Sequence, residues 1–87
     1  MQTDQVLDGL VETLAALEHE RWAHWQSYLH GKAIKQEDGS LMIPSELVKK
    51  WEKQIATPFA NLSNEEKESD REQVQRYLPT IKDALRR

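Results

Sequence analysis

A single stripe, apolar except for one glutamate, dominates the first third of the chain. Its members follow one another at spacings of three or four residues, the periodicity of one face of a helix. They are Leu7, Val11, Leu14, Glu18, Trp22, Trp25 and Leu29. The stripe predicts a helix that starts at Thr3 or Asp4, either of which can cap it, and runs to about Leu29. Gly9 weakens its first turns, and Gly31 offers a stop just after it.

A hairpin is predicted next, because Asp38-Gly39 is a dipeptide favoured in two-residue turns. Pairing outward from this turn sets Ile34 opposite Ile43 and Gln36 opposite Leu41. Ile34, Leu41 and Ile43 would then share one face and cover the core. An irregular loop is the alternative, because two isolated strands are only marginally stable.

Two further helices follow. The first has Ser45 as its cap and ends before Pro58, because the residue before a proline is pushed out of helical geometry. The second opens with Ser63 and Glu66, which have the spacing of a capping box. Pro79 either kinks this last helix or splits it in two. The two apolar faces are Val48, Trp51 and Ile55, and Val74, Leu78, Ile81 and Leu85.

These elements predict one domain over residues 1–87. The fold class is mainly α: a compact three- to four-helix domain with a short β-hairpin between the first and second helices. A chain of 87 residues can bury only a modest core. We expect Phe59 and Leu62, in the connector before the last helix, to plug that core.

Charge and composition narrow the class of partner. The net charge of −3 argues against a nucleic-acid binder held by a general positive field. No apolar run is long enough to span a bilayer, and without cysteine there is no disulfide or thiolate metal site. We therefore expect a cytoplasmic protein that has no nucleic-acid or membrane partner and no cofactor.

Catalytic motifs are missing from the sequence. His19 and His24 are five residues apart, which separates them by about 140° around a helix, so they cannot hold one metal ion together. The serines lie in cap, turn or helix contexts without a glycine-flanked elbow, and the three glycines are scattered. We expect neither enzymatic activity nor a bound metal.

Glu18 is the unusual member of the stripe, since a carboxylate in an apolar sector is costly unless a cation or strong donors meet it. Arg71, and after it Lys67, lie in register with the apolar face of the last helix. Two interpretations stay open. Glu18 and Arg71 can form an internal strut, or they can line a small pocket whose ligand completes the hydrogen bonding. His19, about 100° around the helix from Glu18, fits a semi-buried structural position beside small neighbours.

Four segments, taken in order, resemble the RyR domain, the small repeat named after ryanodine receptors. They are "EHERW", the Asp-Gly hairpin region, "PFANL" and "EKESDR", within a match from about Leu14 to Leu85. The chain also resembles small bacteriophage and prophage proteins of this type. The resemblance implies a compact helical module with a short hairpin, no catalysis, a bacterial host and a nucleotide-derived ligand. The matching positions are Glu18, His19, Trp22, Pro58, Phe59, Leu62, Lys67, Glu68, Asp70 and Arg71.

Two functions follow from these observations. The first is a noncatalytic binding module of phage or prophage type that recognises a nucleotide-like small molecule between the first and last helices. Its ligand-binding residues would be Glu18, His19, Trp22, Trp51, Lys67 and Arg71, with an indole stacking on a base and the two cations meeting anionic groups. The alternative is a protein-interaction or homo-oligomerisation module without a small-molecule ligand, in which Leu7, Val11 and Leu14 pair with another chain.

Overall fold

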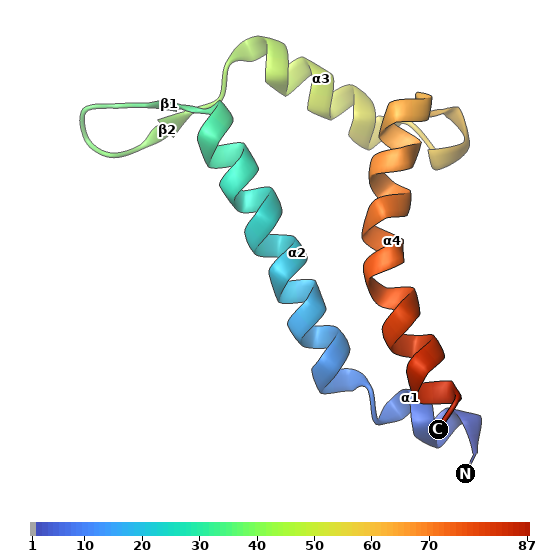
Figure 1. Ribbon diagram of the computed structural model, residues 1–87. Helices are drawn as coiled ribbons and strands as arrows, with labels where there is room; N and C mark the ends of the chain where they lie inside the picture. The colour runs from blue at the N-terminus through green and yellow to red at the C-terminus, as the bar shows by residue number, and fades with distance from the viewer. Residues whose placement is uncertain (1) are drawn as a thin grey trace.

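The computed structural model describes residues 2–87 and has four α-helices and one antiparallel hairpin (Figure 1). The helices are α1 (Thr3–Asp8), α2 (Val11–Lys32), α3 (Ser45–Ala56) and α4 (Asn64–Leu85), with a short 3-10 helix η1 (Phe59–Asn61) before α4. The strands β1 (Ile34–Lys35) and β2 (Leu41–Met42) lie between α2 and α3. The predicted fold class, a mainly helical small domain with a hairpin after the first long helix, is confirmed.

The first predicted helix is in fact two helices. α1 stops at Asp8, and α2 starts at Val11 after a break at Gly9 and Leu10. Gly9 is the residue predicted to weaken this region, and it serves as the C-cap of α1. The prediction that the helix ends at Gly31 is wrong. It lies inside α2, which continues to Lys32.

The hairpin is confirmed, but the predicted register is wrong by one residue. Ile34 pairs with Met42 instead of Ile43. The loop holds three residues instead of two, because Gly39 alone takes a positive φ of 88° and Asp38 Oδ1 accepts hydrogen bonds from both the amide and the hydroxyl of Ser40. A shift of one residue moves a side chain to the other face of a strand, so Ile34 and Leu41 do not share a face. The hairpin projects from the corner between α2 and α3 and covers no core (Figure 1).

The last two helices match their local signals closely. α3 has Ser45 as its first helical residue rather than its cap, and it ends before the extended Thr57 that precedes proline, as predicted. The capping box at α4 is confirmed: Ser63 Oγ accepts from the Glu66 amide at 3.1 Å, and Glu66 Oε1 accepts from the Ser63 amide at 3.2 Å. Pro79 does not split α4, which runs without interruption from Asn64 to Leu85.

The helices form an open frame rather than a closed bundle. α2 and α4 come together near α1 and diverge from there, and α3 spans the wide end (Figure 1). The molecule measures 55 × 34 × 16 Å, and its radius of gyration is 17.5 Å, whereas a close-packed domain of this length has about 12 Å. No residue in 2–87 is buried, so the expected core plug at Phe59 and Leu62 is wrong; Phe59 is half exposed. One layer of helices has no second layer against which to bury its apolar side chains.

Candidate functional site

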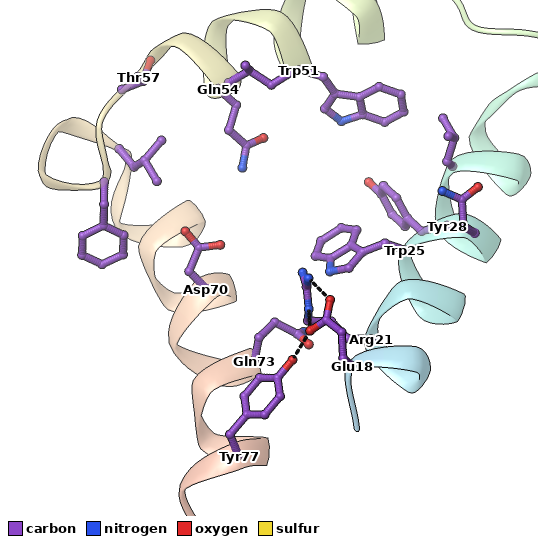
Figure 2. Close-up of a pocket in the computed structure, with 15 residues that line it drawn as sticks. Glu18, Arg21, Trp25, Tyr28, Trp51, Gln54, Thr57, Asp70, Gln73 and Tyr77 are labelled. Carbon is purple, nitrogen blue, oxygen red and sulfur yellow. Dashed lines mark hydrogen bonds and ion pairs between the residues drawn. The ribbon is translucent and has the colours of Figure 1, made fainter. Parts of the chain in front are cut away.

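The frame encloses a cleft between α2, α3 and α4, which we call the central cleft (Figure 2). Its volume is about 870 Å³. Side chains from all three helices and from the segment before α4 line it. They include Glu18, Arg21, Trp25, Tyr28, Trp51, Gln54, Thr57, Asp70, Gln73 and Tyr77, which Figure 2 labels.

A polar cluster joins α2 to α4 at the narrow end of the cleft. Arg21 forms a two-pronged ion pair with Glu18 one turn earlier on α2, with Nε 3.1 Å from Oε2 and Nη2 bonded to Oε1. The Tyr77 hydroxyl on α4 donates to the same Oε2 at 2.8 Å. Within residues 2–87, this is the one side-chain hydrogen bond between distant parts of the chain. Glu18, Arg21 and Tyr77 therefore form the polar link that holds the two long helices at this end.

The proton affinities in this link follow from its hydrogen bonds. The bonds from Arg21 and, after it, from Tyr77 lower the pKa of Glu18 below its ordinary value. The same carboxylate raises the pKa of the Tyr77 hydroxyl, because ionised tyrosine can no longer donate to it. Glu18 keeps 52% of its side chain exposed, so water screens the link and its contribution to stability is small.

The predicted partner of Glu18 is wrong. Arg71 instead bonds Glu68 on its own helix at 3.3 Å, and its guanidinium lies 5.9 Å from the centre of the Phe59 ring. Lys67 Nζ lies over the same ring at 5.9 Å. Both cations lie in the first turns of α4, and this end of α4 is at the wide end of the frame, where α2 and α4 are far apart (Figure 1). Neither cation lines the central cleft.

Two of the six predicted ligand-binding residues, Glu18 and Trp51, line the cleft together. His19 and Trp22 do not. Their rings stack on each other outside it at 5.9 Å and 21°, and Trp22 is 57% exposed. With Lys67 and Arg71 also outside, the structure does not bring the predicted set into one place.

Several cleft residues were not predicted from the sequence. Arg21 carries a detectable signal, because a cation three residues after Glu18 can reach it on the same helix face. Trp25 belonged to the predicted stripe, and its ring now meets that of Tyr28 edge-on at 5.7 Å. Tyr77 carries no signal of this kind, because only the approach of α4 to α2 brings it to Glu18.

The aromatic part of the cleft can stack and its polar part can hydrogen-bond. Trp25 and Tyr28 on α2 face Trp51 on α3 across the opening (Figure 2). Gln73 Oε1 is shielded from solvent and has no hydrogen-bond partner within residues 2–87. Nowhere in the described chain do three His, Asp or Glu side chains gather as metal ligands would.

Among residues 2–87, no helix combines the length and apolar character needed to cross a membrane. No family model matches the sequence, and no curated protein or solved structure matches it either.

Proposed function

We propose that this chain is a noncatalytic protein-interaction module whose binding surface is the central cleft with the apolar side chains around it. One observation supports this most: residues 2–87 include no buried residue, while many large apolar side chains are exposed. Ile55, at the edge of the cleft, is 82% exposed. Large exposed apolar surfaces on soluble domains mark sites of association.

The extent of this surface favours a polypeptide over a small molecule. Exposed apolar residues also lie far from the cleft, at Val11 near the start of α2, at Met42 in the hairpin and at Leu85 at the end of α4. A small ligand in the cleft would leave all of these in water. A folded partner of comparable size can cover cleft and surroundings together.

A nucleotide-like small molecule is the second candidate. Trp25, Tyr28 and Trp51 could stack on a planar base. The resemblance to RyR domains and to phage proteins of that type implies the same class of ligand. Against it, Arg21 is the one cation among residues 2–87 that lines the cleft, and it is already paired with Glu18.

Site-specific photo-crosslinking in the expression host tests the first candidate. A benzophenone amino acid at Ile55 should form covalent adducts with a polypeptide, because this side chain stands at the rim of the cleft and is free to meet a partner. Lys49 is the matched control on the same helix. It is exposed, lies about 120° around the helix axis from Ile55 and does not line the central cleft. Adducts from Ile55 and not from Lys49 support the proposal.

A thermal-shift panel tests the second candidate. Nucleotides and cyclic nucleotides at millimolar concentration should raise the melting temperature if one of them binds the folded chain. A shift that is lost in Trp51→Ala, together with no polypeptide adduct at Ile55, would replace the interaction module by the ligand-binding one. Adducts without any shift leave the interaction module as the function.

A further inference from the structure

The exposed surface is larger than a single folded chain of this mass should have. The accessible area is 7241 Å², whereas a folded monomer of 10.2 kDa exposes roughly 5,300 Å². The excess is about 1,900 Å². Two copies that cover this excess on each other would bury about 3,800 Å² in total, which lies within the range of obligate homodimers.

The shape of the frame indicates what the covering partner must supply. The thinnest dimension is 16 Å, less than half of either other dimension, and the helices lie side by side in one frame rather than in two stacked layers (Figure 1). Stable domains pack at least two layers around a core. A second frame of the same length and width provides the missing layer.

The charge on α4 and on the two residues that follow it favours a second copy as that layer. Residues 64–75 hold five acidic and two basic side chains, a net charge of −3, whereas residues 76–87 hold four basic and one acidic, a net charge of +3. When two copies of α4 run antiparallel, each negative half meets a positive half. A two-fold axis produces such a self-complementary contact.

An apolar residue lies where that axis would cross α4. Val74 stands near the middle of the helix, on the same stripe as Leu78 and Leu85, and 49% of it is exposed. In an antiparallel pair the middle of one helix meets the middle of the other, so Val74 would be covered in both copies.

We propose that two copies of this chain associate through antiparallel α4 helices, with their open frames stacked as two layers of one homodimer. The inference rests on the proposed interaction module and names its partner as a second copy of the same chain. The central cleft is then completed by side chains of the partner.

Sedimentation velocity and light scattering of the full chain test this proposal. The wild type should be a dimer at micromolar concentration. Val74→Asp should raise the dimer dissociation constant by about tenfold or more, because it places a charge at the covered centre of the contact. Gln75→Asp adds the same charge about 100° around the helix at an exposed position and should change the constant less than about threefold. Circular dichroism verifies that both variants keep their helices.

Charge-swapped variants test the antiparallel direction. Glu68→Lys with Glu72→Lys turns the acidic half to a net +1, and Lys82→Glu with Arg86→Glu turns the basic half to a net −1. Each variant alone should self-associate several-fold more weakly at low salt, whereas an equimolar mixture of the two should form heterodimers. All four positions are exposed. The charge-swapped variants leave Val74 unchanged, so they test the direction of the helix pair independently of Val74→Asp.

Two outcomes would overturn the homodimer. One is a wild-type monomer at all concentrations up to the millimolar range, and the other is tighter self-association of the single charge-swapped variants, as a parallel pair would give. If the wild type is monomeric but Ile55 still forms adducts with another polypeptide, the second copy is wrong and the interaction module stands. If the wild type is monomeric and Ile55 also forms no adducts, both the homodimer and the interaction module are wrong.

Discussion

Glu18 is the residue whose role the structure redefines most. Its place in an apolar stripe predicted burial beside a cation of α4, yet the carboxylate is half exposed and bonds Arg21 on its own helix. The only bond that Glu18 receives from α4, within residues 2–87, comes from the Tyr77 hydroxyl. The Tyr77 hydroxyl therefore donates to Glu18 from α4, where the Arg71 guanidinium was predicted to do so. Because Glu18 stays half exposed, the free-energy cost of burying an ion is avoided.

Replacing Tyr77 with phenylalanine should loosen the narrow end of the frame without unfolding the helices. The variant removes one of the two donors that lower the pKa of Glu18, so this pKa should rise toward its ordinary value while staying below it, because Arg21 remains. A carboxyl-carbon NMR titration of Glu18 measures the shift. Tyr28→Phe removes a hydroxyl on α2 and is the matched control, with no change expected at Glu18.

The same link predicts a direction of pH dependence. Because the folded pKa of Glu18 is lowered, its stabilising contribution is complete above the unfolded value of about 4.3 and is lost as the pH falls through the folded pKa. The pKa of Tyr77 is raised, so its contribution is complete below about pH 10 and is lost as the pH rises through its folded pKa. An unchanged Glu18 titration curve in Tyr77→Phe would contradict this account of the link.

At the scale of the elements, the three glycines have three different consequences. Gly9 caps α1 and lies at the break before α2, Gly31 is an ordinary residue inside α2, and Gly39 closes the hairpin with a positive φ of 88°. Only the last of these conformations is strained for other residues. A matched pair of alanine substitutions separates the two kinds of site.

Gly39→Ala should destabilise the hairpin by about 1 kcal/mol, because alanine is strained at this φ. Gly31→Ala should stabilise α2 by about 0.5–1 kcal/mol, since a helix favours alanine. Apart from the chain neighbours and the adjacent helix backbone, no atom of residues 2–87 lies within 4 Å of the added methyl group. Denaturant unfolding followed by circular dichroism measures both. Equal effects at the two positions would contradict the assigned backbone conformations.

At the scale of the whole molecule, the open frame has a consequence for folding. A single layer with no buried residue in 2–87 gains little from apolar burial, and burial is the main force that offsets the entropy lost on folding. In the homodimer that we propose, most of that gain comes from association, so folding and dimer formation are linked.

The melting temperature should therefore increase with protein concentration. In the homodimer each tenfold dilution favours the separated chains, so the thermal transition should move to lower temperature by several degrees between about 500 and 5 μM. Scanning calorimetry or circular dichroism at matched scan rates measures this shift. A transition that stays at the same temperature over this range indicates a frame that is stable alone.

The sequence by itself determined the elements whose signals lie within a few residues. The capping box at Ser63 and Glu66, the end of α3 before Pro58 and the existence of a hairpin at Asp38-Gly39 were all predictable, because neighbouring backbone and side-chain groups produce them. The predicted hairpin register was wrong by one residue, because the loop length depends on which residue takes the positive φ.

Only the tertiary structure decided what the long helices do to one another. The periodic stripe of α2 indicates which residues need covering, but it carries no information about the angle at which α4 approaches. That angle brings Tyr77 instead of Arg71 to Glu18, and it leaves Trp25, Tyr28 and Trp51 around an open cleft. The physical reason is that burial depends on a second surface, and within one chain of this length the frame supplies only one layer.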